Sequence, residues 1–348
     1  MPRFAPKPKS FCMTYQVTIA ASGTRFLVEE NESVLDAALR QGIGLPYGCR
    51  NGQCGSCKGK LLSGKVTYRK PPEALSAEEQ EHGAALFCQA CPQTDLTIAI
   101  HEITTSAEIP VKRFPAKVMS IERLNHDVMR IMLRIPDAMR MQFLAGQYID
   151  FILKDGRRRS FSIANPPHED RVLELHVRHI EGGRFTSDVF DNMHVRDIVR
   201  VEGPLGSFFL REDSQRPVIF MAGGTGFAPI KGIIEHVLKK NIRREFFLYW
   251  GARCREDLYM HEQAQQWARE HDNIHYIPVL SEPRPEDHWD GRTGYVHEAV
   301  LADFASLANY EVYASGPPVM VYAGRDAFLP LGMDPQLYYS DAFEFSND

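Results

Sequence analysis

The chain has 348 residues, enough for two or three domains that each bury a core. Its formal net charge of -5 argues against a general nucleic-acid-binding protein, whose surface would be basic. No apolar run reaches the length of a membrane span, and the N-terminal residues lack the apolar core of a signal peptide. The odd count of 7 cysteines fits a reducing compartment, so we expect a cytoplasmic protein. Residues 1–12, rich in proline and lysine, are expected to form a disordered leader.

A first domain is expected over residues 13–103. Alternating apolar residues over 15–19 and again over 26–28 predict two strands joined by a turn. The segment 33–42 begins with a capping serine, continues with apolar residues on one face and ends at a glycine, which predicts a short helix. A last strand is expected over 96–100, where apolar and polar residues alternate again.

Four cysteines in this first domain have the spacing of a metal centre. Cys49, Cys54 and Cys57 form a C-x4-C-x2-C run in a loop of small residues, and Cys88 follows about thirty residues later. This is the spacing of a plant-type 2Fe-2S site, in which backbone N–H groups of a glycine-rich loop point at the sulfur atoms. A disulfide pair and a zinc site built from two C-x2-C pairs are the alternatives. Zinc held by Cys54, Cys57, Cys88 and Cys91 would leave Cys49 unexplained.

The middle of the chain has a different pattern. Periodicity vanishes over residues 104–112, which are expected to link the first domain to a second one over 113–212. That segment has short alternating stretches separated by Gly, Pro and Asp turns, which predicts an antiparallel barrel or sandwich. Gly182–Ser187 opens a helix after a predicted strand, and free N–H groups at a helix start bind phosphate. The run Arg157–Arg159 by itself is typical of a solvated edge strand.

Residues 213–348 alternate apolar runs with helical patterns, which predicts a parallel sheet wrapped by helices. The strands are expected over 218–222, 246–250, 275–280 and 311–314, and the first helix over 229–240. Gly223–Gly226 lies between the first strand and that helix, where glycines let the backbone approach a pyrophosphate closely. Pro229 would preorganise the first helical turn. The segment therefore predicts a dinucleotide-binding domain.

Taken in this order, the cysteine run, Arg159–Ser162 with its R-x-[YF]-S form, and the two glycine-rich turns resemble the NAD(P)H-dependent reductases that fuse a plant-type ferredoxin to a ferredoxin-reductase module. The resemblance implies a β-grasp 2Fe-2S ferredoxin domain, an antiparallel β-barrel FAD domain and a parallel-sheet α/β NAD(P)H domain. One branch of that family serves oxygenases, and the other contains the CDP-6-deoxy-3,4-glucoseen reductases of dideoxysugar biosynthesis. Four stretches look closer to the sugar branch: Ala145–Asp150, Ser160–Asn165, Asn273–Val279 and Ser340–Phe343.

The family roles transfer onto named positions. The resemblance implies that the cluster is held by Cys49, Cys54, Cys57 and Cys88, that FAD is held by Arg159, Phe161, Ser162, Ile163, Val177, Arg178, Gly183 and Thr186, and that the nicotinamide nucleotide faces Gly224, Thr225, Gly226 and Gly251. Phe343 falls where the family places an aromatic residue against the flavin ring, with apolar packing as the alternative. Ser315 stands where the family usually has the cysteine of a Cys-Gly-Pro motif. Thr225, Ser315 and Phe343 are thus the residues expected around the reacting rings.

The resemblance implies a reaction as well. Hydride would pass from NADH, or from NADPH, to FAD, and single electrons would pass through the 2Fe-2S cluster to a partner enzyme, an iron-sulfur dehydrase or an oxygenase. An iron-sulfur redox sensor is a further reading, whereas a simple ferredoxin-like carrier would not need two nucleotide-binding domains. No protein acid or base is required for the hydride step, so His176, His236 and His297 are expected to be structural or surface residues.

The segment Gly251–Asp257 bears on the choice of nicotinamide. It follows the second strand of the predicted parallel sheet, where such folds meet the adenosine ribose. Arg253 and Arg255 could bind a 2'-phosphate, but Glu256 and Asp257 would repel that phosphate or pair with the arginines first. Most reductases of the family use NADH, and NADH is the nucleotide expected here.

Overall fold

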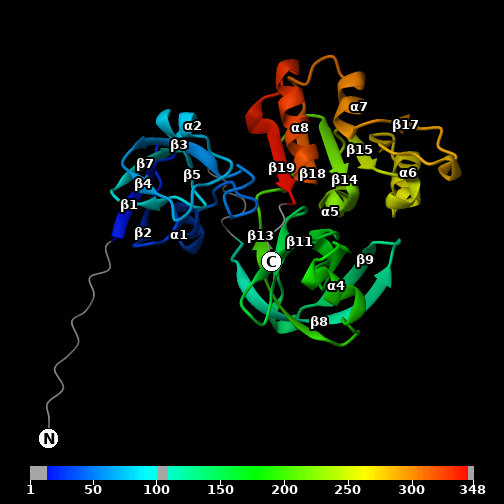
Figure 1. The fold of residues 1–348 in the computed structure, drawn as a ribbon, viewed down its shortest axis with the longest axis horizontal. Coiled ribbons are helices and arrows are strands. Elements are labelled where there is room, and N and C mark those ends of the chain that lie inside the picture. Colours follow the sequence, from blue (N-terminus) through cyan, green and yellow to red (C-terminus); the bar gives the residue numbers. More distant parts are fainter. Residues whose placement is uncertain (1–13, 101–108, 344–348) are drawn as a thin grey trace, which may run out of the picture. The chain divides into compact units, whose positions relative to one another are not determined.

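The computed structural model describes residues 14–100 and 109–343 and divides the chain into two compact units, Met1–Glu108 and Ile109–Asp348 (Figure 1). The predicted leader 1–12 and residues 104–108 of the predicted linker lie outside the described residues. Within the described ranges, no helix is both long enough and apolar enough to cross a membrane.

The first unit is a five-stranded sheet, in the order β2-β1-β7-β3-β5, with a helix packed against it. Its elements are β1 (Thr14–Ile19), β2 (Arg25–Glu29), α1 (Val34–Arg40), β3 (Lys58–Ser63), β4 (Val66–Thr67), α2 (Ala77–Glu81), β5 (Ala84–Leu86), β6 (Cys91–Pro92) and β7 (Leu96–Ala99). β1 pairs with β2 antiparallel and with β7 parallel, which is the arrangement expected of a β-grasp domain. The predicted helix is α1, whose N-cap Ser33 accepts a hydrogen bond from the backbone N–H of Asp36.

The second unit begins with an antiparallel barrel. Its elements are β8 (Lys112–Arg123), β9 (Val128–Arg134), β10 (Tyr148–Ile152), β11 (Arg158–Ser162), β12 (Val172–Arg178), α4 (Arg184–Asp191) and β13 (Ile198–Leu205). The strand order is β11-β10-β13-β8-β9-β12, so β11 and β12 are the two edges of the sheet. A bridge between Ile163 and Leu175 joins these edges just beyond β11. The sheet therefore curls into the predicted barrel, with Leu175 and Val177 in its core.

The second unit continues with a parallel sheet in the order β17-β16-β15-β14-β18-β19. Its elements are β14 (Val218–Gly223), α5 (Phe227–Lys240), β15 (Phe246–Ala252), α6 (His261–Glu270), β16 (Ile274–Leu280), β17 (Arg292–Thr293), α7 (Val296–Asp303), β18 (Glu311–Gly316), α8 (Pro318–Phe328) and β19 (Tyr338–Ala342). Within this sheet the first strand along the chain is β14. The chain next adds β15, β16 and β17 on one side of β14, and later adds β18 and β19 on the other side. The carboxyl end of β14 is therefore the topological switch point, where such sheets bind ligands.

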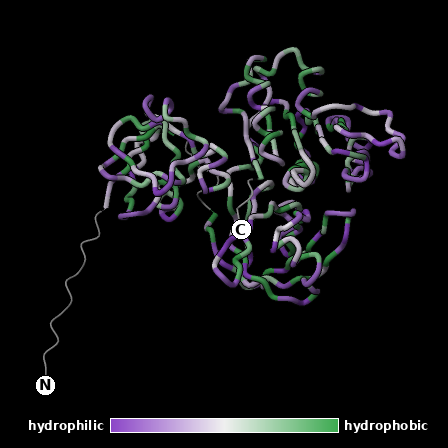
Figure 2. The backbone as a smooth tube through the Cα atoms, in the orientation of Figure 1, coloured by the Kyte–Doolittle hydropathy of each residue, from purple (hydrophilic) through white to green (hydrophobic). Residues whose placement is uncertain are grey.

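Alternate residues of β14 face opposite layers of helices. Phe220 and Ala222 belong to a core that includes residues of α5 and α6, whereas the side chain of Met221 lies against Gly324 of α8. The predicted helix over 229–240 begins two residues earlier, at Phe227, because Gly224–Gly226 form a 3-10 turn that leads directly into it. In Figure 2 hydrophobic residues lie along the central strands of the parallel sheet.

Candidate functional site

The cysteine loop of the first unit brings sulfur atoms and backbone N–H groups together. The backbone N–H of Cys49 donates to Sγ of Cys54 over 3.3 Å, and that of Cys54 donates to Sγ of Cys49 over 3.2 Å. The N–H of Cys88 donates to Sγ of Cys57 over 3.5 Å. A Cβ added at Gly48 would lie only 3.2 Å from Sγ of Cys54, so a side chain there would crowd the sulfur. The loop thus folds around the sulfur atoms in the manner that a cluster requires.

Helix α1 holds the segment that carries Cys88. The N–H of Leu35 donates to the carbonyl of Phe87, and the N–H of Val34 donates to the carbonyl of Ala90, each over 2.9 Å. These bonds satisfy two free donors of the first helical turn and fix the backbone on both sides of Cys88. Cys91 lies beyond this clamp in β6, where it pairs with Thr67 of β4. Cys88 and Cys91 are therefore held differently, although they are close in the sequence: Cys88 lies in the turn after β5, and Cys91 lies in β6.

The thiols form two close pairs. A hydrogen bond with the Cys54 side chain lowers the pKa of Cys49 to about 7, against the opposing effect of burial. The pKa of Cys57 is raised by its hydrogen bond with Cys88 and by burial. None of the cysteines within residues 14–100 and 109–343 is in a disulfide. Four gathered thiols with N–H groups directed at sulfur fit a 2Fe-2S cluster, and the pairing of Cys49 with Cys54 argues against the zinc alternative.

Strand β11 carries the R-x-F-S motif along one edge of the barrel. Arg158 forms ion pairs with Asp150 and Glu202, so the arginine run is not simply solvated as an isolated edge strand would be. Arg159 is half-buried and donates to the carbonyl of Arg158 over 2.8 Å. Phe161 packs against Phe151 and Phe185 with ring centroids 5.6 and 5.5 Å apart. Ser162 and Ile163 follow as buried residues where the barrel closes.

The second predicted flavin segment lies at the end of β12 and the start of α4. α4 begins within the predicted turn, with Gly183 as its N-cap, and Thr186 is buried in its first turn. The Thr186 hydroxyl accepts a hydrogen bond from the N–H of Ile180 over 3.1 Å, so it also braces the turn itself. Val177 is fully buried in the barrel core and is paired with Met129 of β9. The Arg178 guanidinium donates to Asp127 over 2.7 Å.

The glycine turn after β14 meets this flavin segment. Gly224 has φ 53°, a conformation that favours glycine, and a Cβ there would lie 3.2 Å from the Arg178 guanidinium. Arg178, Gly224 and Thr225 line one small cavity together with Asp127, Val128, Asp257 and Tyr259. Residues predicted for FAD and residues predicted for the nicotinamide nucleotide therefore converge at the switch point of the parallel sheet.

The end of β18 packs tightly against the same turn. A Cβ added at Gly226 would lie 1.9 Å from the backbone oxygen of Ser315, so only glycine fits. Ser315 is fully buried, and its hydroxyl has no hydrogen-bond partner among the described residues. An unpartnered buried hydroxyl at this point fits a polar ligand such as a nicotinamide amide. Gly251 is paired with Gly223 at the end of the neighbouring strand β15, and a Cβ added there would lie 2.9 Å from Cβ of Val296 in α7.

The C-terminal strand β19 adds a residue that the motifs did not single out. The Ser162 hydroxyl donates to the carboxylate of Asp341 over 3.1 Å and so joins the barrel to β19. Phe343 is the first residue after β19, and its N–H donates to the carbonyl of Gly316 over 2.9 Å. Asp341 lies between Ser340 and Phe343 in a stretch that the family resemblance had marked. The sequence signal that could have identified Asp341 is its position two residues before Phe343.

Comparison with known proteins agrees with this architecture. Residues 17–93 match the family described as the 2Fe-2S iron-sulfur cluster binding domain. Residues 115–210 match the oxidoreductase FAD-binding domain, and residues 220–326 match the oxidoreductase NAD-binding domain. The predicted three-part fold and the predicted cofactors, a 2Fe-2S cluster, FAD and a nicotinamide nucleotide, are confirmed at the level of these domains.

Relatives from both branches cover nearly the whole chain. The CDP-6-deoxy-L-threo-D-glycero-4-hexulose-3-dehydrase reductase of Yersinia pestis is 40% identical over 95% of this chain and 99% of its own. Terephthalate 1,2-dioxygenase reductase component 1 of Comamonas sp is 36% identical over 96% of this chain and 98% of its own. The crystal structure of the Amycolatopsis cytochrome P450 reductase GcoB is 36% identical, has a TM-score of 0.77, and covers 95% of this chain and 99% of its own. The chain is an oxidoreductase that belongs to the family of NAD(P)H-dependent iron-sulfur flavoprotein reductases, in which a plant-type ferredoxin domain is fused to FAD-binding and NAD-binding domains.

Proposed function

We propose that this reductase takes hydride from NADH at the carboxyl end of β14 and delivers single electrons through the ferredoxin domain to a separate enzyme. The observation that carries the proposal is the convergence of Arg178 with Gly224 and Thr225 on one cavity, in a chain that also gathers four thiols. The flavin supplies the exchange between a two-electron donor and a one-electron carrier. The protein positions these groups and sets the charge around them.

Each group has a proposed set of ligands. Arg159, Ser162 and the start of α4 would bind FAD, because a guanidinium and free N–H groups suit its pyrophosphate. Gly224 would let the nicotinamide nucleotide approach the backbone, and Gly226 would keep the turn close to Ser315, whose hydroxyl would form a hydrogen bond with the nicotinamide amide. Cys49, Cys54, Cys57 and Cys88 would hold the cluster. Asp341 would hold Ser162 in place through their hydrogen bond.

The electron acceptor is proposed by class. The relatives named above serve a sugar dehydrase, a dioxygenase or a cytochrome P450 according to their names. Of these classes we favour an iron-sulfur dehydrase, because the identity is 40% for the dehydrase reductase and 36% for the dioxygenase reductase. An oxygenase is the alternative acceptor. We also place the reductase in the cytoplasm, since its described cysteines are free thiols that a reducing compartment would preserve.

The proposal is tested on the purified holoprotein. Heat release and chromatography of the flavin should yield FAD, and recovery of FMN alone would contradict the proposed pyrophosphate contacts. With NADH the protein should rapidly reduce both ferricyanide and cytochrome c. Very slow reduction of both acceptors by a protein that retains flavin and cluster would favour the redox-sensor reading instead.

Replacing Phe343 by alanine should loosen flavin retention or change the apparent affinity for the nicotinamide nucleotide. Phe343 is half-buried beside Gly316, and an aromatic ring there would cover a flavin face and have to yield to nicotinamide. The visible absorbance of the cluster should stay unchanged. The measurement is flavin content together with steady-state kinetics, and wild-type values in both would reduce Phe343 to a packing residue.

NADH should be preferred over NADPH by about tenfold or more in kcat/KM. Nε of Arg253 lies 3.4 Å from the carboxylate of Asp257, and Arg255 donates to the carbonyl of Asp287 over 3.3 Å, so both arginines are already engaged. Asp257→Asn should weaken the hold on Arg253 and improve the use of NADPH relative to NADH. The matched control is Asp272→Asn at an exposed position. A clear wild-type preference for NADPH would contradict the assignment.

A further inference from the structure

Helix α5 lies directly on the backbone where the barrel closes. A Cβ added at Gly232 would lie 3.1 Å from the carbonyl oxygens of both Ile163 and Asn165. The helix that starts at the glycine turn therefore touches the end of β11, which carries the R-x-F-S motif. This contact brings the proposed nucleotide element and the proposed flavin element within backbone distance of each other.

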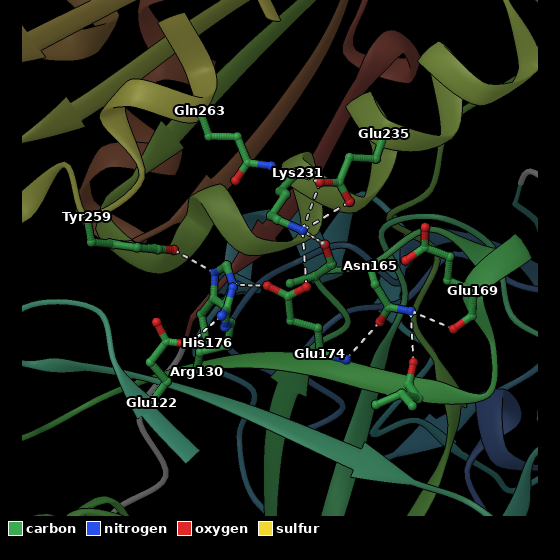
Figure 3. A network of polar contacts seen from close by, with 12 residues as sticks. Glu122, Arg130, Asn165, Glu169, Glu174, His176, Lys231, Glu235, Tyr259 and Gln263 are labelled. Carbon is green, nitrogen blue, oxygen red and sulfur yellow. Dashed lines mark hydrogen bonds and ion pairs between the residues drawn. The ribbon is translucent and has the colours of Figure 1, made fainter. Parts of the chain in front are cut away.

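A buried lysine lies beside this contact. The side chain of Lys231 is 5% exposed, and its Nζ donates to the carbonyl of Ala164 over 3.2 Å and to the carboxylate of Glu174 over 3.1 Å (Figure 3). A third bond, of 3.0 Å, goes to Glu235 one turn further along α5. An ammonium group has three protons, and all three have acceptors here. Such complete pairing is what makes a buried charge tolerable.

The carboxylate partner of Lys231 lies on β12, the other proposed flavin strand. Burial alone would raise the pKa of Glu174, but its hydrogen bond to His176 and the charge of Lys231 lower it to about 2. Burial lowers the pKa of His176, so its ring is neutral. Its Nε2 lies 2.9 Å from the Glu174 carboxylate and must carry the proton, which leaves Nδ1 to accept from the hydroxyl of Tyr259 over 2.9 Å. His176 is therefore structural, as predicted, and not a surface residue.

Tyr259 connects this network to the glycine turn. Its ring meets Trp250 edge-on with centroids 5.3 Å apart, and Trp250 stacks on Phe227, the first residue of α5, with centroids 3.9 Å apart. The indole N–H of Trp250 donates to the carbonyl of Gly224 over 3.0 Å. A continuous set of contacts thus runs from β12 through His176 and Tyr259 to the turn that would face the nicotinamide.

We propose that Lys231 is a positioning residue for hydride transfer, which fixes the separation between the glycine turn with α5 and the two flavin strands β11 and β12. This inference rests on the proposed function. Lys231 would touch neither the flavin nor the nucleotide, and it would act through Ala164 and Glu174. Because hydride transfer requires close approach of the two rings, a small shift of α5 would slow the transfer more than it would weaken nucleotide binding.

The test compares the holoprotein with three variants. Lys231→Met removes the charge at similar length and leaves the buried Glu174 carboxylate without its cationic partner, although the hydrogen bond to His176 remains. The double variant Lys231→Met with Glu174→Gln removes both charges, so it restores folding stability without restoring the tie between α5 and β12. Lys239→Met, an exposed lysine on the same helix, is the matched control. For each protein, anaerobic rapid mixing with NADH gives the limiting rate of flavin reduction and the apparent Kd for NADH.

The limiting rate should fall about tenfold to hundredfold in both Lys231 variants, since misplacement by about 1 Å can cost that much. The apparent Kd for NADH should change by no more than about twofold, and flavin and cluster content should stay at wild-type levels. Lys239→Met should match the wild type. Should Lys231→Met fail to fold, the double variant decides alone. A wild-type limiting rate in the double variant would overturn the proposal, because Lys231 would then contribute stability only.

Failure of the proposed function would look different. A wild-type protein whose flavin is not reduced by NADH would contradict the proposed function before any variant is compared. A wild-type protein that is reduced rapidly, together with a double variant reduced at the same rate, would contradict the positioning role alone.

Discussion

Replacing Cys88 by serine is expected to abolish the visible 2Fe-2S absorbance, whereas replacing Cys91 by serine should leave it intact. The two residues are three positions apart, and spacing alone leaves both available as the fourth ligand. The structure separates them. Cys88 donates its N–H to Sγ of Cys57 over 3.5 Å, whereas Cys91 lies in β6 with its Sγ directed at the carbonyl of Gln89 over 3.9 Å.

The Cys88→Ser protein should still reduce ferricyanide with NADH, since the flavin and nucleotide sites lie in the other unit. Its reduction of cytochrome c should fall to near the background rate, because the one-electron carrier is lost. Flavin content measured in the same samples controls for general damage. Retention of the cluster absorbance in Cys88→Ser, with its loss in Cys91→Ser, would reverse the ligand assignment.

Replacing Gly226 by alanine is expected to damage the nucleotide-binding domain severely. The added Cβ would lie 1.9 Å from the backbone oxygen of Ser315 and 2.4 Å from its carbonyl carbon. Backbone atoms of a central strand cannot turn aside as a flexible side chain can, so the end of β18 or the whole glycine turn must move. Overpacking of this kind costs about 3 kcal/mol of unfolding free energy. NADH-dependent turnover should fall about 100-fold, because the nucleotide would be displaced.

Gly156→Ala provides the matched control. Gly156 has φ 86° in the turn before β11, and a Cβ there meets nothing within 4 Å. Alanine at this position should cost only the conformational penalty of about 1–2 kcal/mol and leave turnover unchanged. The measurements are urea unfolding and NADH–ferricyanide turnover. Equal effects of the two substitutions on unfolding free energy and turnover would show that the close approach of Ser315 to Gly226 does not add to the cost of Gly226→Ala.

Sequence patterns predicted well those parts of the fold and of the site that depend on short stretches of the chain. The cysteine spacing, the glycine turns and the alternating strands each depend on residues close together in the chain. The start of α5 was predicted two residues late because Pro229 was taken as its first residue, whereas the helix begins at Phe227, directly after the glycine turn, and Pro229 lies further along its first turn. The predicted domain boundaries and ligand roles stay predictions until the corresponding proteins are tested.

Long-range contacts were beyond the reach of those patterns. Glu174 and His176 alternate with Leu175 and Val177, a pattern typical of a strand with one face in water, yet α5 and Tyr259 cover that polar face. The partner of Ser162, Asp341, lies 179 positions away in the sequence. No local period encodes either contact, because both depend on how the barrel packs against the parallel sheet.

Anaerobic reduction of the holoprotein by excess NADH tests the central claim, that electrons enter at the switch point of the parallel sheet and leave through the ferredoxin domain. The flavin absorbance near its visible maximum should bleach first, followed by the absorbance of the 2Fe-2S cluster, and electron paramagnetic resonance should then detect the reduced cluster. A flavin that is fully reduced beside a cluster that stays oxidised, although dithionite can reduce that cluster, would contradict the claim.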